Sequence, residues 1–222
     1  MRHIDMVIPT RNRWEKLQRC LRTIPQQVPG VTLSVIVVCD GDCETARRLM
    51  VSCDGVVNRI IFVQRHSGSV FCRNLAIQCA EDAVLYATDD IEFKPDAIEA
   101  AVKSMADHFP DEDGIIGFNQ VGRQGFSKSG VALVGQKFLR RYPNRKLFYP
   151  EYFHFSCQEI ERLGDKLGRI VLEEDASLVH HHPGWNRAEL DKTHEEARMY
   201  RDIDLKLSSK RRAKGLIWGD NG

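Results

Sequence analysis

The sequence lacks the features that would place the protein in a membrane or outside the cell. No apolar run approaches the roughly 20 residues that a bilayer-spanning helix needs. The first residues, Met1–Asp5, lead directly into an apolar segment and do not resemble a signal peptide. Seven cysteines, an odd number, are scattered without Cys-x-x-Cys spacing, which argues against a disulfide framework or a zinc ribbon. We therefore expect a cytoplasmic protein with reduced thiols and no transmembrane segment.

The sequence also lacks an excess of charge of either sign. The formal net charge is +1, so the chain as a whole shows no electrostatic preference for nucleic acid or membrane. One local exception is a basic cluster near the C-terminal end, comprising Lys206, Lys210, Arg211, Arg212 and Lys214. Such a cluster is usually a solvated tail, but it could also bind an anionic acceptor, including DNA.

Neither of the common glycine-rich phosphate-binding motifs is present. The chain has no Walker lysine loop and no G-x-G-x-x-G, so P-loop and Rossmann dinucleotide chemistry are unsupported. Nucleotidyl transfer would also call for a glycine-rich phosphate loop near the first strand, and that loop is missing. Any phosphate chemistry must therefore use another arrangement of residues.

What the chain does contain is a regular alternation of apolar strands and helices over its first hundred residues. The predicted strands are 4–8, 33–39, 60–63 and 84–86, and the predicted helices are 14–24, 44–50, 70–83 and 95–109. Continuous apolar strands that alternate with helices are typical of a parallel sheet covered on both faces. With 222 residues the chain can bury one sizeable core. We predict an α/β fold with a doubly wound, mostly parallel sheet flanked by helices.

The pattern changes after about residue 110. Short strands are predicted at 115–118, 131–134, 170–172 and 177–179, with helices at 136–142, 158–167 and 186–207. Between them, Gly122–Ser129 is rich in glycine and serine and is predicted to be a loop that could order over a bound ligand. We expect this part to form a smaller, acceptor-side region.

Two adjacent carboxylates, Asp89 and Asp90, follow the apolar strand Val84–Tyr86. Carboxylates at the end of a buried strand are costly unless water, a cation or hydrogen-bond donors meet them. Ligands in open α/β sheets bind at the carboxyl ends of the strands, and Mg²⁺ and Mn²⁺ take oxygen ligands that they share with substrate phosphates. The pair therefore indicates a metal site, although a surface turn with a capping Asp is the plain alternative.

A run of histidines, His180–His182, provides a second candidate for metal binding. A neutral imidazole is a good ligand for Mn²⁺. Alternation along an extended chain would place His180 and His182 on one side and His181 on the other. A chance run of surface histidines is the alternative.

Taken together, the segments VIPTRNR, VIVVCDGD, HSGSVFCRNLA and YATDDI, in this order and spacing, resemble those of the family 2 glycosyltransferases of the GT-A fold. The resemblance covers the chain from Ile4 to about Tyr200. It implies that a nucleotide-diphosphate sugar, with a UDP-sugar favoured, lies across the sheet. It also implies that Mn²⁺ or Mg²⁺ bridges the diphosphate to the Asp motif, and that transfer inverts the anomeric centre.

The resemblance assigns roles to individual residues. It implies a nucleotide-sugar site made of Pro9, Thr10, Arg13, Asp40, Gly68, Arg73, Asn74 and Asp89. Asp90 would bind the metal, with His180 as the first and His182 as the second choice for a further ligand. The family's Asp-x-Asp motif is incomplete here, because Thr88 stands at its first position.

The catalytic base is the residue for which the family pattern fails. Counting back from Gly168 places Cys157 where the family has an Asp, with Glu159 as the second acid. We predict Glu159 as the base that deprotonates the acceptor hydroxyl. His154 is an alternative, and so is an altered site.

These assignments divide the chain into three parts. Residues 1–110 would form the nucleotide-sugar-binding half, 111–185 the acceptor-side and metal-histidine half of the same domain, and 186–222 a charged helix with a basic tail. The acceptor could be a glycan, a small molecule or modified DNA, the last by similarity to bacteriophage glycosyltransferase-like proteins. The missing acids at Thr88 and Cys157 keep open a catalytically inactive nucleotide- or glycan-binding module.

Overall fold

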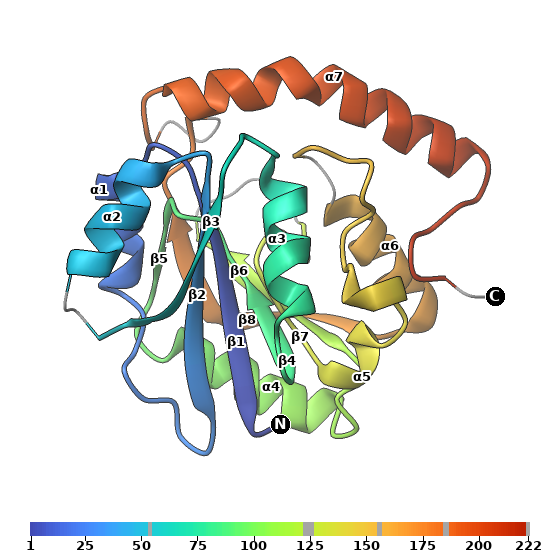
Figure 1. The fold of residues 1–222 in the computed structure, drawn as a ribbon. Helices are drawn as coiled ribbons and strands as arrows, with labels where there is room; N and C mark the ends of the chain where they lie inside the picture. Colours follow the sequence, from blue (N-terminus) through green and yellow to red (C-terminus); the bar gives the residue numbers. More distant parts are fainter. Residues whose placement is uncertain (53–54, 122–126, 155–156, 184–186, 221–222) are drawn as a thin grey trace.

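A computed structural model describes residues 1–52, 55–121, 127–154, 157–183 and 187–220. Within these residues, eight strands form one twisted sheet with helices on both faces (Figure 1), in the order β3-β2-β1-β4-β7-β6-β8-β5. The strands are β1 (His3–Thr10), β2 (Thr32–Asp40), β3 (Val57–Val63), β4 (Ala83–Tyr86), β5 (Ile91–Phe93), β6 (Ile115–Gln120), β7 (Ala132–Val134) and β8 (Ile170–His180).

The first four strands form the parallel half that the apolar pattern predicts. β1 pairs in parallel with both β2 and β4, and β2 pairs in parallel with β3. Their carboxyl ends therefore meet at one edge of the sheet, where Thr10, Asp40 and the Asp89–Asp90 pair follow. The prediction of a doubly wound, mostly parallel α/β sheet is confirmed.

The second half continues the same sheet. β7 is antiparallel to both β4 and β6, and β8 is parallel to β6. One sheet thus crosses residue 110, and the two predicted halves share it. The two strands predicted at 170–172 and 177–179 are a single strand, β8, because the chain stays extended through an irregularity in its pairing with β6 after Phe118.

The sequence pattern missed a short strand directly after the aspartate pair. β5 pairs antiparallel with β8, and its first residue, Ile91, lies opposite His180. This register sets Asp90 beside the histidine run. A three-residue strand gives too little periodicity to be recognised from sequence.

Helices on the two faces bury two apolar cores. The helices are α1 (Trp14–Leu21), α2 (Cys43–Val51), α3 (Ser69–Gln78), α4 (Ala97–His108), α5 (Gln136–Leu139), α6 (Cys157–Leu167) and α7 (Lys192–Ala213), with a 3₁₀ turn η1 (Pro143–Arg145). Side chains along a strand alternate in direction, so Met6 and Ile8 pack in the core with α1, α2 and α4, whereas Val7 packs with α3, α5 and α6. Each fully buried aliphatic side chain stabilises the fold by roughly 1.5–3 kcal/mol.

Helix α7 lies across the carboxyl edge of the parallel strands (Figure 1). It begins at Lys192 and ends at Ala213, about six residues later at each end than the 186–207 that charge patterning predicts. Its start is fixed by a capping box, in which Asp191 accepts from the backbone N–H of His194. Farther along, Tyr200 stacks on Phe153 with ring centroids 3.6 Å apart.

Two further properties bear on the expected location. In the described part of the chain, no helix has the length and apolarity to cross a membrane. The cysteines that the structure describes as free thiols are Cys20, Cys39, Cys43, Cys72 and Cys79.

We expect Asp204 to be the main anchor of α7. Its fully buried carboxylate accepts from the backbone N–H groups of Phe153 (3.0 Å) and His154 (2.8 Å). Asp204→Ala should lower the free energy of unfolding by roughly 2–4 kcal/mol, because both N–H groups lose their carboxylate. Urea denaturation measures this, with Asp202→Ala, an exposed carboxylate of the same helix, as control. Equal stabilities of the two variants would contradict the assignment.

Candidate active site

A cavity of about 790 Å³ lies between the carboxyl edge of the sheet and α7. It gathers residues from the ends of β1, β2, β4 and β8 and from helices α3, α6 and α7. Of the residues predicted from sequence, those that line it are Pro9, Thr10, Arg13, Asp40, Arg73, Asp89, Asp90, His180 and His182. Residues up to 173 positions apart in sequence thus meet in one place.

Gly68 and Asn74 do not line the cavity but hold its walls in position. A side chain at Gly68, whose φ is +89°, would meet the carbonyl oxygen of Phe153 at 2.6 Å, so this close approach requires glycine. Asn74 both donates to and accepts from the backbone of Phe148, at 2.8 and 3.0 Å. These two residues fix the 147–154 segment against α3.

Asp40 lines the cavity with a carboxylate that is already engaged. Its two oxygens accept from the backbone N–H groups of Ser67 (2.7 Å) and Gly68 (3.0 Å). A backbone N–H pair at the start of α3 is thereby satisfied, and the residue is 4% exposed. Asp40 therefore orders the loop before α3 and contributes to the cavity wall.

Asp89 is buried and is held by donors from β1 and the turn that follows it. Thr10 Oγ1 donates to Asp89 at 2.8 Å, and Arg13 Nη1 lies 3.2 Å from its other oxygen. Burial raises the pKa of Asp89, with Arg13 opposing the shift and Asp90 adding to it. The arrangement leaves an aspartate that can accept a hydrogen bond from a ligand hydroxyl.

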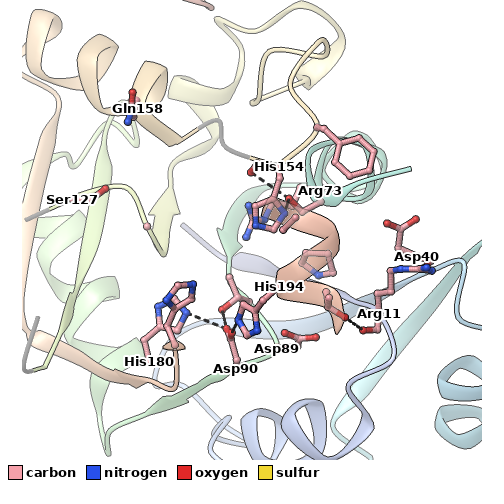
Figure 2. Close-up of a pocket in the computed structure, with 18 of the residues that line it drawn as sticks. Arg11, Asp40, Arg73, Asp89, Asp90, Ser127, His154, Gln158, His180 and His194 are labelled. Carbon is pink, nitrogen blue, oxygen red and sulfur yellow. Dashed lines mark hydrogen bonds and ion pairs between the residues drawn. The ribbon is translucent and has the colours of Figure 1, made fainter. Parts of the chain in front are cut away.

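Asp90 is faced by imidazoles on two sides (Figure 2). His180 Nε2 lies 3.1 Å from one carboxylate oxygen, and His194 Nε2 lies 3.8 Å from the other. Burial alone would raise the pKa of Asp90, but the interactions with His180, His194 and Arg13 outweigh it and hold that pKa well below its ordinary value. Asp90 is therefore an anion throughout the neutral range.

His182 completes the group of imidazoles. Its ring centroid lies 5.4 Å from that of His180 and 5.2 Å from that of His194. Burial, reinforced by the charge of His180, lowers its pKa to about 4, so it is neutral at pH 7 and keeps a lone pair. His181 points the other way, 2.6 Å from Glu92, as strand alternation predicts.

The donor set around Asp90 fits a divalent cation by its chemistry. A carboxylate together with imidazoles, of which His182 is neutral, suits Mn²⁺, and His194 Nε2 is buried without a hydrogen-bond partner among the described residues. As they stand, no three His, Cys, Asp or Glu side chains of the described residues form a ready metal site. Such ions commonly take their remaining ligands from substrate phosphates and water.

Sequence reasoning missed the contribution of α7. Besides His194, the helix region supplies Asp191, whose two carboxylate oxygens accept from Nε and Nη2 of Arg13, both at 2.9 Å. Glu196 likewise pairs with Arg11 at 2.7 and 3.2 Å. The sequence signal at this point, Asp-x-x-His, is that of a helix cap, and nothing in it indicates contact with residues about 180 positions earlier.

Glu159, the predicted base, is not in the cavity. Its carboxylate is 2% exposed. It accepts from Tyr152 Oη (2.6 Å), from two nitrogens of Arg211 (2.6 and 3.0 Å) and from the backbone of Trp218 (2.7 Å). A carboxylate with all its lone pairs occupied cannot take a proton from an acceptor hydroxyl. This placement argues against the predicted role and makes Glu159 an anchor for the C-terminal segment.

A different acid of α6 faces the cavity. Glu161 lines it, and its Oε2 accepts from the hydroxyls of Ser127 (2.9 Å) and Ser129 (3.0 Å). Asp165, one turn on, also lines the cavity and pairs with Lys128 at 2.8 Å. Most of the predicted loop 122–129 lies outside the described residues; of those that are described, Ser127 reaches the cavity.

His154, the alternative base, is also at the cavity wall. Its Nδ1 lies 3.2 Å from Ser69 Oγ. Burial, with the charge of Arg73 acting in the same direction, lowers its pKa to about 4. An imidazole of such low pKa is a weak base at neutral pH.

Comparison with known proteins identifies the family. A family profile described as Glycosyl transferase family 2 matches residues 5–194. The chain belongs to this family. A comparison with curated protein sequences found no match.

The solved structures that resemble this family 2 chain are GT-A glycosyltransferases. The mannosyltransferase PcManGT from Pyrobaculum calidifontis, in complex with GDP-Man and Mn²⁺, has a TM-score of 0.65 and 17% identity over 91% of this chain and 61% of its own. S. aureus TarS with UDP-GlcNAc gives 0.58 and 15% over 74% and 53%. GalNAc-T7 with UDP, GalNAc and Mn²⁺ gives 0.62 and 12% over 81% and 44%.

The chain thus spans less than two thirds of the length of these three proteins. At such identities the likeness establishes the fold, and the GT-A expectation is confirmed.

The contacts of Glu159 predict how stability depends on pH. Hydrogen bonds from Arg211 and Tyr152 outweigh burial and lower its pKa below the ordinary 4.5. The stabilisation is therefore complete above pH 4.5 and is lost as the pH falls through the folded-state pKa. Glu159→Gln should cost about 1–3 kcal/mol at pH 7 and flatten the loss of stability below pH 4.5.

Urea denaturation at pH 7, 5, 4 and 3 measures this dependence. Glu99→Gln, at an exposed position of α4, is the control and should follow the wild-type profile. An unchanged acid slope in Glu159→Gln would show that the carboxylate does not carry this stability.

Proposed function

We propose that this glycosyltransferase moves a sugar from a nucleotide-diphosphate sugar to an acceptor hydroxyl and depends on Mn²⁺ or Mg²⁺. The observation that carries the proposal is the buried, ionised Asp90, faced by the imidazoles of His180 and His194 at the carboxyl edge of the sheet. A buried carboxylate is costly unless cations or hydrogen-bond donors compensate its charge. A cation shared with a diphosphate accounts together for the carboxylate charge, the imidazoles beside it and their position at the edge of the sheet.

The donor is proposed to lie along the cavity from Asp40 to Asp90. Arg73 lines this stretch and can meet phosphate oxygens, and Asp89 is placed to accept from a ribose or sugar hydroxyl. Thr10 and Arg13 hold Asp89 in this orientation. We favour UDP as the nucleotide because TarS and GalNAc-T7 are solved with UDP-GlcNAc and UDP, although PcManGT is solved with GDP-Man.

The proposed metal ligand from the Asp motif is Asp90, with His180, His182 and His194 as the imidazoles within reach. A bound divalent cation would neutralise charge on the departing diphosphate. Among these imidazoles, His194 belongs to α7. Because His194 lines the cavity, the packing of α7 over the cavity is needed to complete the proposed site.

Loss of the Asp90 charge should abolish metal-dependent nucleotide binding. For Asp90→Asn we expect at least a tenfold weaker affinity for UDP in the presence of Mn²⁺, because one anionic ligand is removed while size is kept. Calorimetric titration of UDP and GDP, with and without Mn²⁺, measures this. Glu92→Gln is the control, since Glu92 pairs with His181 on the other side of the chain. Equal affinities of wild type and Asp90→Asn would contradict the metal assignment.

For the base we propose Glu161 in place of Glu159. Its carboxylate lines the cavity and is oriented by two serine hydroxyls, which leaves its other oxygen, Oε1, for an acceptor hydroxyl. In an inverting transfer, that oxygen takes the hydroxyl proton as the acceptor attacks the anomeric carbon and the bond to the diphosphate breaks.

The assignment of Glu161 predicts a separation of binding from turnover. Glu161→Gln should lower the rate of UDP release from its UDP-sugar, with water or acceptor as nucleophile, on the order of 100-fold. UDP affinity should stay unchanged. Asp165→Asn, one turn away at the same cavity wall, should stay within a few-fold of wild type. A base elsewhere would leave Glu161→Gln as active as Asp165→Asn.

A catalytically inactive binding module stays as the second candidate. The observation that favours it is that the carboxylate of Glu159 is buried against Arg211 and does not line the cavity. A wild-type protein that binds UDP with Mn²⁺ but releases none from any UDP- or GDP-sugar would support it. A cytoplasmic location stays a prediction.

A further inference from the structure

Arg162, on α6, is a cation at the cavity wall with unsatisfied donors. Its Nε and Nη2 are buried and have no hydrogen-bond partner among the described residues. The nearest carboxylate oxygen in its ion-pair contacts, on Glu159, lies 3.8 Å away, beyond hydrogen-bond length. Buried charged donors without a partner are costly and call for an explanation.

Glu159 cannot supply that partner. A carboxylate has about four lone-pair sites. On Glu159 these accept from Tyr152, twice from Arg211 and from the backbone of Trp218. The fold therefore uses this carboxylate for Arg211 and leaves Arg162, which lines the cavity, without a carboxylate partner at hydrogen-bond length.

A second guanidinium lines the same cavity from α7. Arg212 is exposed, and no ion pair of the described residues involves it. It is the neighbour of Arg211, which meets the same Glu159 oxygen that lies 3.8 Å from Arg162. Between the two helices, Ser208 Oγ lies 3.5 Å from Gln158 Oε1. The two arginines therefore belong to one end of the cavity, where α6 and α7 meet.

This end is separate from the place proposed for the donor. Figure 2 shows Gln158 and Ser127 on the far side of the cavity from Asp40 and Arg11. The acids nearby are engaged, since Asp165 pairs with Lys128 and Glu161 accepts from two serines. The segment 206–214 contains five basic residues and no acid, so it adds positive charge at this end of the cavity.

We propose that Arg162 and Arg212 bind a phosphate group of the acceptor. Two guanidinium groups on different helices can each take different oxygens of a tetrahedral phosphate, and Arg is suited to such bidentate contacts. A carboxylate offers only two oxygens in one plane. The inference rests on the proposed function, because it places the acceptor opposite the donor and beside Glu161.

The test titrates phosphate probes into protein whose nucleotide site is filled with UDP and Mn²⁺. The probes are ribose 5-phosphate and a short single-stranded thymidine oligonucleotide, with ribose as the uncharged control that lacks the phosphate group. Ribose 5-phosphate and the oligonucleotide both carry phosphate groups. The one that binds more tightly shows whether the site prefers a small sugar phosphate or a phosphodiester chain. Ribose should not bind measurably.

We expect Arg162→Gln and Arg212→Gln each to weaken binding of the better phosphate probe about tenfold, the effect of losing one charge-assisted contact. Arg198→Gln removes the same charge from an exposed position of α7 that does not line the cavity, and it should bind like wild type. Because Arg212 is exposed, its variant keeps the fold even if Arg162→Gln is destabilised.

Two results would overturn the inference: no binding of either phosphate probe, or equal binding by wild type and both cavity variants. Repeating the titration without nucleotide separates this failure from that of the proposed function. If wild type does not bind UDP but the arginine variants still lose the phosphate probe, the donor site is wrong and the phosphate site stands.

Discussion

Compensation of the buried Asp89–Asp90 pair is the constraint on which the site depends. Both residues are 3% exposed, at the end of a strand that is itself fully buried. Their charges require donors. Thr88, in the same turn, donates to Asp90 at 2.6 Å, and the other donors come from four separate parts of the chain: Thr10 at the end of β1, Arg13 before α1, His180 at the end of β8 and His194 on α7. The second half of the fold thus brings His180 and His194 to the end of β4.

The sequence predicts most of the framework because its signals are local. Continuous apolar runs mark β1, β2 and β4, and a polar residue at each end marks the edge that carries the site. Asp90 and His180 are recognisable because a carboxylate pair and a histidine run are unusual on their own. The fold class and nine of the cavity-lining residues follow from such patterns together with the family resemblance.

What the sequence could not supply depends on packing between distant segments. Glu159 and Glu161 are two positions apart on α6, so they point about 200° apart around the helix. One therefore enters the interior and meets Arg211, while the other faces the cavity. The family pattern favoured Glu159 from sequence, and only the packing of α7 shows that Arg211 occupies its carboxylate. His194 was hidden for the same reason, because its spacing from Asp191 is that of a helix cap.

The position of α7 late in the chain affects the order in which the site is assembled during synthesis. Proteins are synthesised from the N-terminus, and earlier segments begin to fold first. The parallel sheet with its aspartates can form while α7 is still being made, yet His194 and the partners of Arg11 and Arg13 are contributed by that last helix. A nascent chain thus carries an unfinished site until its final described helix is released.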